Sequence, residues 1–308
     1  MRAADPAGAG GQTGGGGGLI GRRRFLAVAA AGLTGAAGAG PLRWRGRALG
    51  AEVALELHGP RAVPALAAAR AALAEVEALF SLYDPGSTLS RLNAAGGADD
   101  LPPAFMALVA QADRVHAATE GLFDPTIQPL WRALAEGRDP GPARRAVGWQ
   151  RVVRGPAAVR LAPGQALSFN GIAQGYAADR VTAALRAEGL TRALVDMGEH
   201  RGLSGPWRLA LEDPAAGRIG TRTFADGAVA TSSPAALRLG AESHILHPLG
   251  GLPRWSTVSV EAPRAALADG VSTALCLAPL SVAEAVRAGV PELGRITLID
   301  GRGDVVTL

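Results

Sequence analysis

The chain of 308 residues contains no lysine and only one cysteine, and both scarcities exclude particular kinds of chemistry. Without lysine the protein has no Schiff-base nucleophile and no phosphate-binding lysine of the P-loop type. A single cysteine, Cys276, cannot form an internal disulfide or a metal site built from several thiolates. Because Cys276 lies in the apolar stretch 274–278, we expect it to be a buried small hydrophobic residue.

The chain also lacks a charge excess once its first 40 residues are set aside. Those residues hold four arginines and one acid, and the remainder has 27 arginines against 26 acids, a formal net charge of +1. This balance gives no electrostatic reason to expect nucleic-acid binding. Hydrophobic residues make up 48% of the chain, which together with the low net charge argues against disorder.

The amino-terminal segment has the pattern of an export signal. Three consecutive arginines, Arg22, Arg23 and Arg24, precede Phe25-Leu26 and an uncharged, mildly apolar run that ends near Gly40. This pattern predicts a twin-arginine signal over residues 1–40, removed from a mature domain of residues 41–308 in the periplasm. The run is too short and too rich in alanine and glycine for a stable membrane anchor. The alternative is a basic tail without targeting function.

Hydrophobic periodicity beyond residue 50 predicts strands and helices that do not alternate regularly, which favours an α+β fold over a doubly wound sheet. Helices are expected at 64–82, 104–119, 173–188 and 268–278. Strands are expected at 52–58, 193–195, 207–211, 227–231 and 257–261, and hairpins at 150–161 and 296–308.

Two segments carry residue types suited to binding a phosphorylated ligand. Residues 168–179 run from a strand end through small residues into a helix, whose first backbone N–H groups can bind an anion. Asp269 and Thr273 lie four residues apart, so one helix face would offer two hard oxygen ligands that suit Mg²⁺. The alternatives are an ordinary tight turn for the first segment and a helix-capping role for Asp269.

Two further groups of residues have both a functional and a structural interpretation. His244 lies beside a turn, where it could act as a general base or be an ordinary structural histidine. Tyr83 and Phe123 lie beside turns, where aromatic rings can stack on a planar ligand or can belong to the core.

Considered together and in order, these segments resemble the ApbE family of FAD:protein FMN transferases, from about residue 48 to the end of the chain. The matching blocks are Phe80-Ser81-Leu82-Tyr83 with Ser87 and Asn93, Gly121-x-Phe123-Asp124-Pro125-Thr126, Gly171-Ile172-Ala173-x-Gly175-Tyr176-x-x-Asp179-Arg180, Asp196-x-Gly198-Glu199, Ala230-Thr231-Ser232, His244-Ile245-x-x-Pro248 and Asp269-x-x-Ser272-Thr273-Ala274. The residues of the blocks at 171–180 and 196–199 are most similar to those of the periplasmic subgroup associated with nitrous oxide respiration.

The resemblance implies a single compact α+β domain related to the T-fold, with mixed sheets and packed helices. It also implies an enzyme that binds FAD and Mg²⁺, transfers FMN to a Thr or Ser hydroxyl of an exported or membrane flavoprotein, and releases AMP. By position, the residues implied are His244 as the catalytic base, Gly171, Asp269, Ser272 and Thr273 at the metal, and Tyr83, Leu122, Phe123, Asp124, Ser168 and Gln174 at FAD.

Several positions depart from the family pattern and keep other functions open. Ser168 stands where many members have Asp, and Gln174 stands where many have Lys or Glu. Leu49 and His247 also replace residues that are usual in the family. One alternative is an FAD pyrophosphatase, in which water replaces the acceptor hydroxyl. The other is an exported flavin-binding or assembly protein without catalytic activity.

Overall fold

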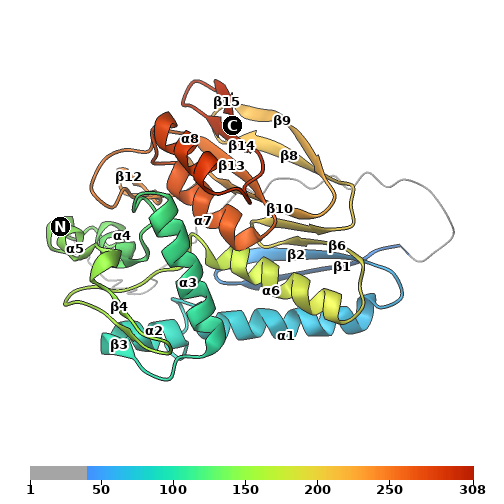
Figure 1. Cartoon of the computed structure of the whole chain (residues 1–308), viewed down its shortest axis with the longest axis horizontal. Coiled ribbons are helices and arrows are strands. Elements are labelled where there is room, and N and C mark those ends of the chain that lie inside the picture. Colours follow the sequence, from blue (N-terminus) through green and yellow to red (C-terminus); the bar gives the residue numbers. More distant parts are fainter. Residues whose placement is uncertain (1–39) are drawn as a thin grey trace, which may run out of the picture.

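The computed structural model describes residues 40–308, so the predicted export signal lies outside the described residues apart from Gly40. An eight-stranded sheet organises this part of the chain, in the order β1-β2-β6-β7-β10-β13-β14-β15 (Figure 1). Its strands are β1 Leu42–Ala48, β2 Ala51–His58, β6 Arg192–Asp196, β7 His200–Leu203, β10 Gly227–Ser232, β13 Thr257–Ala262, β14 Ile296–Ile299 and β15 Val305–Thr307. Every pairing in it is antiparallel.

Alternating residues explain how the first two strands of the sheet are oriented. In β2, Val53, Leu55 and Leu57 are buried, while the residues between them are partly exposed. Since successive side chains point to opposite faces, one face of β2 joins the core. Arginines alternate with other residues along β1 at Arg43, Arg45 and Arg47, all of which are exposed. β1 therefore forms an edge strand whose charged face points into solvent, a feature that discourages pairing with a further strand.

Three helices lie together over one face of this sheet (Figure 1). α1 (Ala62–Phe80) packs against α6 (Ala173–Ala187), which packs against α7 (Ala265–Leu275), and α7 in turn contacts β10 and β13. Small residues allow the last two helices to approach closely. A Cβ atom added at Gly175 of α6 would lie 2.3 Å from the carbonyl oxygen of Ala265, at the start of α7.

We expect Gly175→Ala to destabilise the fold by about 3 kcal/mol, because the added methyl group meets backbone that cannot rotate away. The free energy of unfolding, measured in urea, would reveal this loss. Gly289→Ala is the matched control, since Gly289 is also helical and a Cβ there has no atom within 4 Å. Equal stability of the two variants would contradict the close approach of α6 and α7.

Further helices and a three-stranded sheet form the left half of Figure 1. The helices are α2 Thr88–Ala95, α3 Pro103–Ala118, α4 Gln128–Ala135 and α5 Pro140–Ala146, and the strands are β3 Gly97–Ala98, β4 Val153–Arg154 and β5 Val159–Arg160. The rings of Phe80, Phe105 and Phe169 pack together with centroids 5.1 to 6.0 Å apart. This aromatic cluster joins α1 and α3 to the segment that leads into α6.

Two hairpins and one helix complete the described residues. The hairpins are β8 Trp207–Asp213 with β9 Gly217–Phe224, and β11 Arg238–Leu239 with β12 Glu242–Ser243, and the helix is α8 Leu280–Gly289. The β8–β9 hairpin packs on β7, where a Cβ at Gly202 would meet Trp207 and Phe224 at 2.7 Å. Over residues 40–308 we find no helix that is both long and apolar enough to span a membrane.

The predicted α+β class and the compact domain of sheets and packed helices are confirmed. Mixed sheets were expected from the family resemblance, whereas all described strand pairings are antiparallel. The predicted helices correspond to α1, α3, α6 and α7, with ends shifted by up to three residues. Cys276 is fully buried, as predicted.

Candidate active site

Three of the residues predicted to bind a metal, Asp269, Ser272 and Thr273, lie on one face of α7, where that helix crosses α6, and the fourth, Gly171, lies just before α6. Asp269 is 97% buried, and its Oδ2 accepts a hydrogen bond of 2.9 Å from the backbone N–H of Gly175. Asp269 lies in the middle of α7, so the alternative that it caps this helix is wrong. Its carboxylate instead binds a first-turn amide of α6, which would otherwise have no intrahelical partner.

Asp179 of α6 caps α7 from across the crossing. Its two carboxylate oxygens accept hydrogen bonds of 2.9 and 3.0 Å from the backbone N–H groups of Ala265 and Ala266. Arg201 of β7 lies 3.4 Å from the same carboxylate. Burial raises the pKa of Asp179, and the two amides and Arg201 oppose that rise. Each of the two helices therefore supplies a carboxylate to the amino-terminal end of the other.

Hydroxyl and carbonyl oxygens gather beside Asp269. Thr273 Oγ1 lies 3.4 Å from the carbonyl oxygen of Gly171, and Ser232 Oγ lies 2.8 Å from Ser272 Oγ and 3.3 Å from Thr273 Oγ1. A Cβ at Gly171 would come within 3.0 Å of the Thr273 side chain, so the absence of a side chain permits this approach.

This group of oxygens suits a hard cation of the Mg²⁺ type. Among residues 40–308, no three His, Cys, Asp or Glu side chains form a metal-binding group. Mg²⁺ is often bound through one or two carboxylates together with substrate phosphates, and its octahedral ligands lie about 3 Å apart. Asp269, Thr273 and the Gly171 carbonyl offer one carboxylate and two neutral oxygens, with the last two 3.4 Å apart. The donor set therefore fits the ion that the sequence analysis expected.

The end of β10 links this group to His244. Ser232 contacts Ser272, and the carbonyl of Pro234, two residues later, lies 3.2 Å from His244 Nδ1. The carbonyl of Leu237 lies 3.1 Å from the same nitrogen. Carbonyl oxygens only accept hydrogen bonds, so Nδ1 carries the proton in the neutral ring and Nε2 is the basic nitrogen. The short path from Ser232 to Pro234 keeps the imidazole in the neighbourhood of α7, since each residue spans at most 3.8 Å.

Two of the segments predicted to contact FAD lie side by side near Gly171. The backbone N–H of Ser168 donates a 2.8 Å hydrogen bond to the carbonyl of Pro125. The buried ring of Phe123 would lie 3.3 Å from a Cβ at Gly171, and Leu122 beside it is half-buried. The sequence blocks around residues 122–125 and 168–171 thus form one wall next to the oxygen group.

Asp124 has contacts of a structural kind in this wall. One carboxylate oxygen accepts hydrogen bonds from the backbone N–H and the hydroxyl of Thr126, at 2.8 and 2.5 Å. The other accepts a 3.0 Å hydrogen bond from the backbone N–H of Trp149. These bonds hold the short helical turn 125–127 in place, and a contact of Asp124 with FAD stays a prediction.

The remaining predicted flavin residues lie at two other points. Gln174 is buried in the first turn of α6, and its side-chain amide would lie 3.5 Å from a Cβ at Gly198. Tyr83 is 72% exposed, and its ring would lie 2.8 Å from a Cβ at Gly50. An exposed ring beside a bare glycine is available for stacking on a planar ligand.

Sequence reasoning did not single out Ser232, Asp179 or Glu199 as site residues, although all three lie in the matched blocks. Glu199 accepts a 2.9 Å hydrogen bond from the backbone N–H of Thr231, next to Ser232. Each of the three contacts residues that are distant in the sequence, and no local sequence pattern predicts such contacts. The ordered resemblance was the one signal that could have found them.

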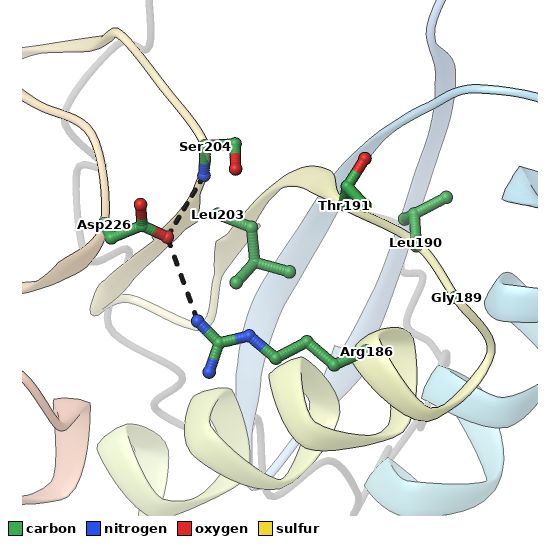
Figure 2. Close-up of a pocket in the computed structure, with 7 residues that line it drawn as sticks. All are labelled: Arg186, Gly189, Leu190, Thr191, Leu203, Ser204 and Asp226. Carbon is green, nitrogen blue, oxygen red and sulfur yellow. Dashed lines mark hydrogen bonds and ion pairs between the residues drawn. The ribbon is translucent and has the colours of Figure 1, made fainter.

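The cavity shown in Figure 2 contains none of the predicted site residues. It has a volume of about 290 Å³ and lies between the end of α6 and β7. Asp226 bridges its walls, lying 3.8 Å from Arg186 and accepting a 3.2 Å hydrogen bond from the backbone N–H of Ser204. We therefore assign this cavity no role in the candidate active site.

The chain is similar to known proteins over most of its length. A model of the ApbE family matches residues 49–292. An FAD:protein FMN transferase from Vibrio cholerae is 28% identical over 233 residues, covering 66% of this chain and 70% of the relative. The apo structure of the flavinyl transferase ApbE from Pseudomonas stutzeri has a TM-score of 0.72 and 26% identity, with 87% of this chain and 94% of that chain covered. The flavin transferase ApbE from Vibrio cholerae has the same fold, with a TM-score of 0.74 at 22% identity over 87% of this chain and 97% of that one.

Proposed function

Because this chain belongs to the ApbE family, we propose that it is an enzyme that transfers FMN from FAD to a hydroxyl group of an acceptor protein. The observation that carries the proposal is the convergence of Asp269, Thr273 and the Gly171 carbonyl at the crossing of α6 and α7. Curated relatives with this activity match the chain over about two thirds of its length. FAD is then the substrate, and a flavoprotein is the acceptor.

We further propose that the acceptor group is a Thr or Ser hydroxyl. Its oxygen attacks the phosphorus on the FMN side of the FAD pyrophosphate, and a phosphoester bond forms. The bond from this phosphorus to the bridging oxygen breaks, and AMP leaves with that oxygen. His244 takes the hydroxyl proton at Nε2, because its Nδ1–H is engaged by the carbonyls of Pro234 and Leu237.

The oxygen group on α7 would hold Mg²⁺ in this proposal, through Asp269, Thr273 and the Gly171 carbonyl, with Ser272 beside them. When bound, the ion would neutralise charge on the pyrophosphate and so make the phosphorus easier to attack. Ser232 orients both hydroxyl groups through its bonds to Ser272 and Thr273. The Asp269–Gly175 bond fixes the carboxylate against α6.

The decisive experiment combines the purified chain, FAD and Mg²⁺ with an exported flavoprotein domain from the same genome. A fluorescent acceptor band on a denaturing gel, together with AMP release, is the expected result. EDTA should abolish the band, added Mg²⁺ should restore it, and replacing the acceptor Thr by Ala should prevent it. Free FMN and AMP without a labelled band would identify an FAD pyrophosphatase instead, and intact FAD would identify a flavin-binding protein.

We also propose that the enzyme acts in the periplasm on an exported or membrane-bound flavoprotein. The support is the arginine run ahead of Phe25-Leu26 in the sequence. We expect Arg22→Lys with Arg23→Lys to retain the protein in the cytoplasm, because the twin-arginine route reads the arginine pair itself. Cell fractionation measures the outcome, and Arg2→Lys is the matched control. Normal export of the double variant would contradict the assignment.

A further inference from the structure

The loop between β12 and β13 presents two leucines to solvent. Leu249 is 88% exposed and Leu252 is 74% exposed, whereas Ile245 and Pro248 at the start of the loop are buried. At its other end, the backbone N–H groups of Arg254 and Trp255 donate hydrogen bonds of 2.8 and 3.2 Å to the carbonyl of Cys276. The loop is thus fixed at both ends and holds its apolar tip away from the core, as interaction sites often do.

Two arginines lie beside this tip. The guanidinium of Arg144 in α5 would lie 3.5 Å from a Cβ at Gly250, and Arg254 follows in the loop itself. Both are exposed, and neither forms an ion pair with a carboxylate among residues 40–308. Residues 244–254 contain no acid.

The positive charge continues over α4 and α5, which pack against each other and, through α4, against β11. A cavity of about 350 Å³ lies there, with Arg132, Arg138 and Arg145 in its walls. The two acids between the helices are already engaged, since Glu136 pairs with Arg138 at 2.6 Å and Asp139 accepts a hydrogen bond from the backbone N–H of Gly141. We call the area formed by Leu249, Leu252, Arg144, Arg254 and this cavity the basic loop surface.

The basic loop surface adjoins His244 along the chain. The loop begins directly after β12 with His244, and Leu249 follows five residues later, a span of less than about 19 Å. The loop tip therefore lies within reach of a protein whose hydroxyl contacts His244. Four arginines without ion pairs favour an acidic partner, because opposite charges steer association and suppress wrong partners.

We propose that the basic loop surface docks an acidic, partly apolar segment of the acceptor flavoprotein. This inference rests on the proposed function, since it assigns the surface to the acceptor of that reaction. The two leucines supply apolar burial, and the arginines supply charge complementarity and register.

A binding experiment tests the inference without requiring transfer. The probe is a fluorescein-labelled peptide of about 20 residues with a central Thr, a Leu on each side and flanking Asp and Glu residues. A second probe has Asn and Gln in place of the acids. We expect the chain to bind the acidic probe roughly tenfold more tightly by fluorescence anisotropy, and high salt should remove this difference.

Variants locate the interaction on the protein. Arg144→Glu with Arg254→Glu should weaken binding of the acidic probe by about tenfold and leave the neutral probe unaffected. Leu249→Ser with Leu252→Ser should weaken both probes. The matched control is Arg45→Glu with Arg47→Glu on β1, two exposed arginines that also have no ion pair with a carboxylate in the described part of the chain. This control should bind as the unmodified chain does. Circular dichroism checks that each variant is folded.

Equal affinity for the two probes, or no binding of either one, would overturn the inference. So would an Arg144→Glu, Arg254→Glu variant that binds as tightly as the unmodified chain. None of these outcomes bears on flavin transfer, which is read from the labelled acceptor band. Conversely, absence of that band would contradict the proposed function while probe binding is measured independently.

Discussion

Asp269→Asn should reduce flavin transfer by at least about 10³-fold, because its buried carboxylate accepts the bond from Gly175 and would also hold the proposed cation. Asparagine has almost the same size, and its carbonyl oxygen can still accept the Gly175 hydrogen bond. The fold should therefore survive while the negative charge is lost. Transfer is measured by labelled acceptor and released AMP, and Mg²⁺ binding is measured by calorimetry with FAD present.

A control variant tests whether the effect is specific to Asp269, because it makes the same Asp-to-Asn change outside the candidate site. Asp226→Asn removes an exposed acid that binds Arg186 and the Ser204 amide, far from α7 in the sequence. It should transfer flavin at the normal rate. If Asp269→Asn kept full activity and full Mg²⁺ binding, the metal assignment would be wrong, although membership of the family would stand.

His244→Gln should lower the maximal rate of transfer by roughly 10²–10⁴-fold, the usual contribution of a general base. Glutamine can still donate a hydrogen bond to the carbonyls of Pro234 or Leu237, but it cannot accept a proton. The loop should therefore keep its place, and the KM for FAD should change little. Steady-state kinetics with varied FAD and acceptor concentrations separate these quantities.

His247→Gln is the control for this variant, since it changes a second histidine in the same loop. Burial lowers the pKa of His247, and the nearby Arg254 and Arg144 lower it further. We expect an unchanged maximal rate for His247→Gln at saturating acceptor. A normal rate in His244→Gln would show that another group, or the solvent, accepts the hydroxyl proton.

Local sequence patterns predicted those elements whose signals are contained within one segment. α6 is an example, since its apolar spacing and the closing Gly189 lie within 17 residues, and Gly189 adopts the left-handed conformation with φ +77°. The strands β2, β10 and β13 were predicted for the same reason. β1 was not predicted, because only Ala48 among its residues is buried and its arginines leave little apolar alternation to mark a strand.

Hydrophobic periodicity did not predict the short helices α2, α4 and α5. Each has seven or eight residues, so two turns of pattern cannot be told from a loop. Capping was the better signal, since Ser87 and Asp139 accept hydrogen bonds from the amides of Ser90 and Gly141.

Local sequence patterns predicted still less of the candidate site, because its contacts join distant segments. Spacing predicted that Asp269 and Thr273 share a helix face, and they do. It could not predict that Asp269 would bind Gly175, 94 residues away, or that Asp179 would take over the capping of α7. These contacts depend on how two helices cross, and the missing side chain at Gly175 permits that close crossing.

The reaction of the buried Cys276 with a thiol reagent would report local opening of the structure beside the candidate site. Its Sγ lies 3.4 Å from the carbonyl of Ser232, and burial raises the pKa of the thiol far above its usual range. A thiol reagent can therefore modify the protein only when the end of α7 separates from β10. Because Cys276 is the single cysteine in the sequence, the labelling rate of the protein reports this opening alone. A ligand that bridges α7 and β10 should slow the labelling in proportion to its occupancy.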